Sequence, residues 1–253
     1  MARRTVQKLE DLPPFTDADF RAFETHKRRS ADFNPERLVL KRKLAAIGEP
    51  LRAAVRKAGE DLTLRTSIHN PYVFNGHSVG NLRLYLSPAD KAKKPLRDLL
   101  GVEFAADTDA SYVHANLVLA IDHDGLQIGL RVHERAWWDT QNMKGRCRER
   151  EGAEEFAAAL NALPESYVLT LHDWQREYRC GSIRWDDVLE FFRYFEPVTH
   201  RVRVTRTVAK DDPIATDVRL FSEVAREFVA MIPLYRFILW SPENNHLGLG
   251  GRR

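Results

Sequence analysis

The chain has 253 residues, with 39 Lys and Arg against 36 Asp and Glu, and 43% of its residues are hydrophobic. This composition provides a core and excludes a disordered chain, while the near balance of charge means that any anion site is local. No apolar run approaches the roughly 18 residues of a membrane span, and the N-terminus lacks the apolar stretch of a secretory signal. We therefore expect a cytoplasmic protein without a membrane partner.

The first third of the chain carries helix signals. Thr16 is a good N-cap for a short helix, because its hydroxyl can accept a first-turn N–H, and Asn34 followed by proline starts a second helix. An apolar stripe follows Asn34, and we expect Gly48 and Pro50 to break or bend this helix. Its basic residues, Arg37 among them, are expected on a solvated face that has the option of contacting phosphates.

The period then changes to two, which predicts strands over residues 62–69 and 81–86. Ser87 and Pro88 open a short basic helix that ends near Gly101. The clearest local signal is a hairpin over residues 113–133, in which Asp124-Gly125 supplies a turn able to take positive φ.

The last part of the chain alternates short helices and strands. In order, we expect a helix through Phe156, Leu160 and Leu163, strands at 167–171 and 176–180, a helix from Trp185 to Phe195, a strand around 201–204, and an amphipathic last helix from Ile214 to Ile232. Helices at both ends around a mainly antiparallel sheet, with helices also on one face, describe an α+β fold. We expect a lead-in segment at 1–14, a single domain at 15–240 and a C-terminal tail at 241–253.

Three segments carry a family resemblance: Phe15-Thr16-Asp17-Ala18-Asp19-Phe20, Gln127-Ile128-Gly129-Leu130 and Pro233-Leu234-Tyr235-Arg236. With the order of the elements, they make the chain similar to the YktB-like families of bacterial proteins of unknown function. Residues 69–80 do not match. The resemblance implies an α+β unit and brings no reaction, cofactor or ligand.

Motifs of common enzymes are absent from the sequence, including the phosphate-binding GxxxxGK[ST], GxGxxG after a strand, HExxH and GxSxG. Cys147 and Cys180 lack a ligand spacing, so we expect two free thiols and no metal site. Nothing in the sequence identifies a nucleophile or a cofactor.

The strongest candidate site depends on strand periodicity. If the predicted strands form one sheet and their polar sides coincide, one face collects Arg65, His69, Arg83, Tyr85, His114, Asn116, Arg131 and His133. Guanidinium and imidazole groups recognise phosphates and carboxylates, so this pattern predicts an anion site. The alternatives are that solvent covers this face, or that a covering helix supplies acids that pair with these bases.

Three smaller groups are also candidates. They are a loop with Asn70, Tyr72, Asn75 and His77, the pair Trp137-Trp138 with Lys144, Arg146 and Arg148, and the pair His172-Asp173. Each group also has an interpretation without function. The loop residues can serve only to form turns, and one Trp of the pair can belong to the core while the arginines are solvated. His172 and Asp173 are neighbours on a strand, so their side chains point to opposite faces.

The leading functional hypothesis is a binding protein for a phosphorylated small molecule or a nucleic-acid segment. One alternative is a hydrolase or phosphoryl-processing enzyme with His114 or His133 as general acid or base. A second alternative is an interaction scaffold that presents its last helix or the tail from Leu239 to Arg253, whose ordinary state is a loosely ordered end.

Overall fold

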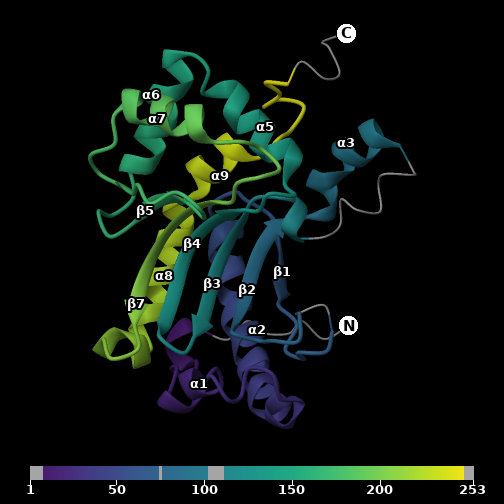
Figure 1. Ribbon diagram of the computed structural model, residues 1–253, viewed down its shortest axis with the longest axis vertical. Coiled ribbons are helices and arrows are strands. Elements are labelled where there is room, and N and C mark those ends of the chain that lie inside the picture. The colour runs from purple at the N-terminus through teal and green to yellow at the C-terminus, as the bar shows by residue number, and fades with distance from the viewer. Residues whose placement is uncertain (1–7, 74–75, 102–110, 248–253) are drawn as a thin grey trace. The chain divides into compact units, whose positions relative to one another are not determined.

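The computed structural model describes residues 8–73, 76–101 and 111–247 (Figure 1). Within them, seven strands form an antiparallel sheet in the order β1-β2-β3-β4-β7-β5-β6, accompanied by eight α-helices. The predicted α+β class is therefore confirmed. The strands are β1 (Leu62–Thr66), β2 (Asn81–Pro88), β3 (Asn116–Asp122), β4 (Gly125–Val132), β5 (Val168–Leu171), β6 (Tyr178–Arg179) and β7 (Val202–Ala209). The helices are α1 (Asp17–Arg21), α2 (Asn34–Lys57), α3 (Asp90–Leu100), α5 (Trp137–Arg146), α6 (Arg150–Asn161), α7 (Trp185–Tyr194), α8 (Arg219–Ala230) and α9 (Ile232–Ile238).

The chain forms two compact units. The first contains Met1–Leu86, Val118–Ile128 and Thr207–Val229, and the second contains Ser87–Leu117, Gly129–Arg206 and Ala230–Arg253. Helices α1, α2 and nearly all of α8 belong to the first unit, and α3, α5, α6, α7 and α9 belong to the second. The division into a lead-in, one domain and a tail stays a prediction.

In the first unit, the Asp19 carboxylate stabilises the start of α1 through hydrogen bonds. The Thr16 backbone N–H donates to Asp19 Oδ2 at 2.8 Å, and the Thr16 hydroxyl donates to the same oxygen at 3.1 Å rather than accepting a first-turn N–H. Lys43 of α2 binds this carboxylate at 2.6 Å. The Phe15 ring meets Phe221 of α8 edge-on at 5.6 Å. These contacts join α1, α2 and α8 around a buried aromatic core.

Helix α2 runs without interruption from Asn34 to Lys57, so the expected break at Gly48 and Pro50 does not occur, and the alternative of a bend there stays a prediction. Pro50 has no N–H to donate within the helix, yet it is buried among apolar neighbours that hold the helix together. A Cβ at Gly48 would lie 2.4 Å from Leu64 Cδ1. Glycine at this position therefore lets α2 approach β1 closely, and tertiary packing overrides the local breaking signal.

The predicted hairpin is confirmed as β3 and β4, with its turn one residue earlier than expected. His123 and Asp124 connect the strands, and the Asp122 carboxylate accepts the N–H groups of Asp124 at 2.9 Å and Gly125 at 3.1 Å. This side-chain bond shapes the turn in place of a left-handed residue at Asp124.

Two glycines of β4 let it pack tightly beside β7. A Cβ at Gly129 would lie 2.1 Å from the Val204 carbonyl oxygen, and a Cβ at Gly125 would lie 2.1 Å from the Val208 carbonyl oxygen. Their φ angles are +154° and +156°, which L-residues rarely adopt. The backbone of β7 thus occupies the space that side chains would fill at these two positions.

The structure differs from the expectations at two helices. Residues 137–146 form α5, which was not predicted, ahead of the predicted helix α6. The expected long last helix is divided into a 3-10 turn at Pro213–Thr216, α8 and α9, because Pro233 starts a new helix near its N-terminus. Phe156 of α6 contacts Phe192 of α7 at 5.6 Å and Phe237 of α9 at 5.2 Å, so these helices share a core.

Residues 239–247 follow α9 and are held by side-chain amides. Asn244 Nδ2 donates to the Leu239 carbonyl at 2.7 Å, while its Oδ1 accepts from Arg146 at 3.0 Å. The His246 N–H donates to Asn142 Oδ1 at 2.9 Å. The described part of the C-terminal segment is therefore fixed against α5 rather than loosely ordered. No helix in the described part of the chain is long and apolar enough to cross a membrane.

Candidate functional site

Arg65, Arg83 and Tyr85 lie on one face of the β1–β2 pair in the first unit. The Ser67 N–H donates to the Arg83 carbonyl at 2.9 Å, so these two residues face each other across the pair. The Ser67 hydroxyl accepts the Arg83 N–H at 3.0 Å. Because side chains on a strand alternate with a period of two, Arg65 and Tyr85 lie on the same face as Arg83. Strand pairing thus brings three of the predicted residues together.

The two arginines of this face have no acidic partner. Arg65 is exposed and Arg83 is half-buried, and among the described residues neither has a carboxylate within 4.0 Å. The Nε atom of Arg83 is buried and has no hydrogen-bond acceptor in the described part of the chain. A desolvated N–H of a cation is costly unless it is paired, so this group favours a ligand oxygen.

Arg37 adds a buried positive charge to the first unit, which corrects its assignment to a solvated helix face. Its guanidinium is fully buried and donates to the carbonyls of His69 at 3.0 Å, Lys27 at 3.0 Å and Ser30 at 2.5 Å. The Asn34 side-chain oxygen accepts a fourth bond at 2.8 Å. All four acceptors are neutral, so they satisfy the donors and leave the charge in place.

His69 follows β1, and the positive charge of Arg37 acts on its imidazole. Burial, and then the positive charges of Lys41 and Arg37, lower the pKa of its imidazole. Its Nδ1 is buried without a hydrogen-bond partner among the described residues. Burial is thus the main effect on the pKa of His69, and the nearby charges of Lys41 and Arg37 act in the same direction.

His114 and Asn116 belong to the second unit and are only 3% and 5% exposed. His114 Nδ1 lies 3.8 Å from Asp139 Oδ2, and Asn116 Nδ2 donates to the His114 carbonyl at 3.2 Å. The buried Asp139 of α5 provides an acid beside a histidine that was expected on an acid-free face. These two predicted residues are thus part of the interior, where a ligand at the sheet surface does not reach them.

Asp139 is itself a structural acceptor. Its Oδ2 accepts the Ala115 N–H at 2.6 Å and its Oδ1 accepts the Trp240 N–H at 2.9 Å. Burial raises the pKa of this carboxyl to about 7, against the lowering effect of the two backbone bonds. The side chain joins the start of β3, helix α5 and the segment after α9.

His133 and the half-buried Arg131 lie at the end of β4 in the second unit. His133 Nδ1 accepts the Arg135 N–H at 3.2 Å and lies 3.4 Å from Glu134. Two nitrogens of Arg201 bind the Glu134 carboxylate, and the bond from Arg201 lowers the pKa of that carboxyl to about 2. An imidazole whose Nδ1 accepts a backbone bond carries its proton on Nε2, so its basic nitrogen is already engaged.

The predicted loop between β1 and β2 contains an Asx turn, in which Asn70 Oδ1 accepts the Tyr72 N–H at 3.0 Å. The Tyr72 ring is 61% exposed and lies 6.0 Å from the His77 ring. His77 adopts a left-handed φ of 60°. Asn75 lies outside the described residues. Within the described part, these residues act in turn formation.

The Trp137-Trp138 group is divided between surface and interior. Trp137 is 37% exposed, while Trp138 packs against Trp240 with ring centroids 5.9 Å apart. Arg146 binds Glu155 at 2.7 Å and lies over the Phe237 ring at 4.0 Å. A Trp pair whose second ring is packed offers one exposed ring rather than a stacking platform.

His172 and Asp173 do not form a catalytic pair. Asp173 lies between two histidines, with His172 Nδ1 3.9 Å from its Oδ1 and His200 Nε2 3.2 Å from its Oδ2. The Nδ1 of His200 accepts the Glu196 N–H at 2.9 Å. His172 Nδ1 accepts the Arg201 N–H at 3.2 Å. Both imidazoles use their basic nitrogen for the backbone, so they support structure rather than proton transfer.

No cluster of three or more His, Cys, Asp or Glu side chains suited to a metal ion occurs among the described residues. No protein-family model matches the chain, and no curated protein matches it. The resemblance to the YktB-like families therefore stays a prediction.

Sequence reasoning missed two features of the second unit. Asp139 received no role from the sequence, although a carboxyl directly after the apolar Ala136-Trp137-Trp138 is a signal for a buried acceptor. A cavity between α5 and α7 was also missed, because its lining residues lie in two segments about 40 positions apart. Only the tertiary structure joins those segments.

Proposed function

We propose that the protein binds the phosphate groups of a nucleic-acid segment through the polar face of β1 and β2. Arg83 carries this proposal: its Nε is buried without an acceptor among the described residues, and its guanidinium has no carboxylate partner there. Arg65 lies exposed on the same face and also has no carboxylate within 4.0 Å among the described residues. A pair of unneutralised guanidinium groups with a fixed backbone is a phosphate-contacting arrangement.

The second support for the proposal is the electrostatic setting. The buried Arg37 is surrounded by neutral acceptors, and the pKa of His69 is lowered by burial and by the charges of Lys41 and Arg37. Glu36 interacts with Arg37 and offsets part of its charge, while Lys41 and Arg37 together give a positive potential at His69, after the end of β1. Such a potential attracts polyanions and concentrates them at the arginines.

An extended ligand suits this face better than an enclosed one. β1 is the edge strand of the sheet, and Arg65 on it is exposed. Small-molecule sites usually bury 70–90% of their ligand within a concave pocket, whereas a nucleic-acid backbone can lie along an open strand pair. The half-buried Tyr85 ring beside the arginines offers a surface for one base.

The enzyme alternative has less support than the binding proposal. His114 is buried beside Asp139, and the Nδ1 of His133 accepts a backbone N–H, which leaves only the Nε2 of the half-buried His133 for proton transfer. The scaffold alternative is weakened in the same way, because residues 239–247 are bonded to α5 and α9.

A fluorescence-anisotropy titration with a labelled 20-nucleotide single-stranded DNA tests the proposal. We expect saturable binding that weakens with salt, with a slope of log K against log salt near −0.7 for each phosphate contact. Arg83→Gln and Arg65→Gln should each weaken binding several-fold and reduce the slope by about 0.7. Unlabelled AMP serves as a competitor that carries one phosphate group without a strand.

Arg226→Gln is the matched control. Arg226 is exposed on α8 of the same unit, and its removal lowers the net charge by the same amount. Equal losses in Arg226→Gln and Arg83→Gln would mean that binding follows net charge, and the proposed face would be rejected. Competition by AMP at concentrations similar to those of the oligonucleotide would reject a nucleic-acid segment as the ligand and favour a phosphorylated small molecule.

A further inference from the structure

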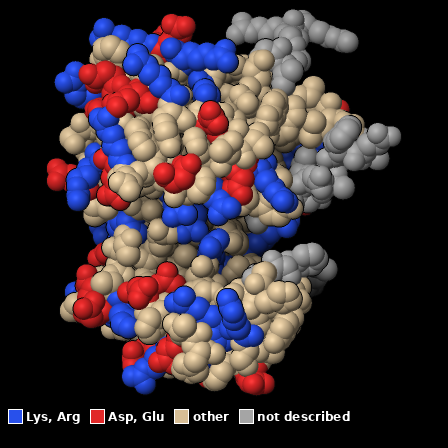
Figure 2. All heavy atoms as spheres, viewed as in Figure 1, with Lys and Arg blue, Asp and Glu red and all other residues tan. Residues whose placement is uncertain are grey.

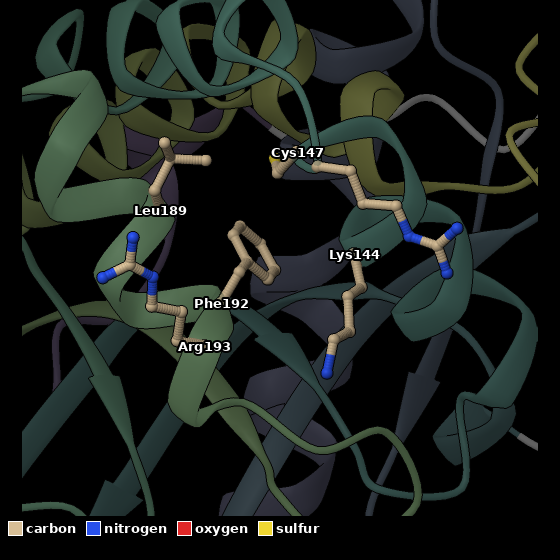
Figure 3. Close-up of a pocket in the computed structure, with 6 residues that line it drawn as sticks. Lys144, Cys147, Leu189, Phe192 and Arg193 are labelled. Atoms are coloured by element: carbon tan, nitrogen blue, oxygen red, sulfur yellow. The ribbon is translucent and has the colours of Figure 1, made fainter.

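A cavity of about 250 Å³ lies in the second unit, between the end of α5 and the second half of α7 (Figure 3). Its lining residues are Lys144, Cys147, Arg148, Leu189, Phe192 and Arg193. Figure 3 shows the side chains of Cys147, Leu189 and Phe192 around the same space. No acidic residue lines it, although acids are common on the neighbouring helices.

The inner wall of the cavity is apolar. Cys147 is 1% exposed and Phe192 is 5% exposed, and Leu189 completes this wall. Burial raises the pKa of the Cys147 thiol above its usual range, so the sulfur is uncharged and acts as a small apolar group. The wall therefore favours a hydrocarbon or aromatic body over a fully polar ligand.

The rim of the cavity is cationic. Lys144 Nζ donates to the Phe195 carbonyl at 2.7 Å, which fixes this ammonium at the C-terminal end of α7. Arg148 and Arg193 are exposed, and neither has a carboxylate within 4.0 Å among the described residues.

The neighbouring arginines contrast with this pair. Arg146, Arg150 and Arg184 each bind an acid at 2.7 Å. Figure 2 shows the same mixture of basic and acidic side chains over α6 and α7. Arg148 and Arg193 are thus two arginines without a carboxylate partner among the described residues, and both line a cavity that has an apolar wall.

We propose that this cavity binds a small carboxylate with an apolar body, of the aryl-acetate class. The apolar body packs against Phe192 and Leu189, and the carboxylate meets the guanidinium of Arg193 or Arg148 at the rim. A volume of about 250 Å³ is near the lower end for ligand pockets, so it suits a ligand of about ten non-hydrogen atoms. This site lies in the other unit from the proposed phosphate-binding face, so either proposal can fail without the other.

The test is an NMR titration of protein labelled with ¹³C in its leucine methyl groups, in which the Leu189 resonances report on the cavity. Phenylacetate should shift them saturably with a dissociation constant on the order of 1 mM, as ligand efficiency allows for ten atoms. Phenylacetamide keeps the shape without the charge, acetate keeps the charge without the ring, and inorganic phosphate is a different anion. We expect each of these three to bind at least about tenfold more weakly.

Variants at the rim test the assignment of the charge. Arg193→Gln and Arg148→Gln are exposed changes, and at least one should weaken phenylacetate binding on the order of tenfold. Arg179→Gln, an exposed arginine without a carboxylate partner among the described residues, is the matched control and should change nothing. Equal binding of phenylacetamide, undiminished binding in both rim variants, or no saturable shift at Leu189 would overturn the proposal.

Discussion

Replacing the buried Asp139 with Asn should change how stability depends on pH. The wild-type carboxyl accepts two backbone N–H groups, from Ala115 and Trp240, and burial raises its pKa from 3.8 to about 7. Asn presents one acceptor oxygen, so its amide nitrogen faces one of those N–H groups. That unmade bond should cost about 1–3 kcal/mol at a pH where both side chains are neutral.

The sign of the pH effect follows from the raised pKa. Between about pH 4 and pH 7 the folded protein holds a proton on Asp139 that the unfolded chain has released, so the free energy of unfolding falls as pH rises. A shift of about three pKa units corresponds to about 4 kcal/mol in the free energy of unfolding. This contribution is lost as the pH rises through the window, and the free energy changes no further from this cause at higher pH. Asp139→Asn does not titrate, so the stability advantage of wild type over the variant should shrink by up to this amount from pH 4 to pH 7.

Urea unfolding followed by tryptophan fluorescence at half-unit steps from pH 4 to pH 8 measures this difference. Other titrating groups cancel because both proteins contain them, except His114, whose Nδ1 lies 3.8 Å from Asp139. The comparison is therefore repeated in a His114→Gln background. A difference that stays constant or grows between pH 4 and pH 7 in both backgrounds would refute the reasoning.

Three further predictions concern stability and reactivity. Gly129→Ala should destabilise the protein by about 2–4 kcal/mol in urea unfolding, because its Cβ would lie 2.1 Å from a β7 carbonyl, whereas Gly80→Ala has open space and should cost under about 1 kcal/mol. Arg37→Met should cost about 3 kcal/mol or more in the same assay, and Arg37→Lys should not restore it, because one ammonium cannot reach four acceptors. Burial raises the pKa of Cys180 to about 12 and that of Cys147 further, so both thiols should react slowly with a disulfide reagent at pH 8 and rapidly in guanidinium. Rapid reaction of the folded protein, a large loss in Gly80→Ala or rescue by Arg37→Lys would contradict these expectations.

Strand periodicity predicted much of the fold because it depends on neighbouring residues alone. The hairpin of β3 and β4, the strands β1 and β2, and the shared face of Arg65 and Arg83 all follow from a period of two. The helix that begins at Asn34 follows from an equally local signal. Local rules failed where a distant contact decided the outcome, as at Gly48, where close packing against Leu64 keeps α2 continuous.

Local sequence patterns could not predict which of the candidate site residues are buried. His114 and Asn116 alternate as expected on a strand, but the region around Asp139 places them in the interior. Asp139 bonds to partners 24 and 101 positions away, and no periodicity records such separations. The sequence therefore predicted which side chains share a strand face and not which of them solvent reaches.

The two glycines of β4 also define what a distant relative of this chain should keep. At Gly125 and Gly129 the neighbouring carbonyl oxygens of β7 occupy the place of a Cβ, so any substitution would push the strands apart. Helix surfaces can drift through many substitutions, whereas these positions tolerate a single residue type. A glycine pair spaced by four within an alternating apolar strand is thus the part of the sequence that should change least during divergence, and it offers a short signature for a chain that matches no family model.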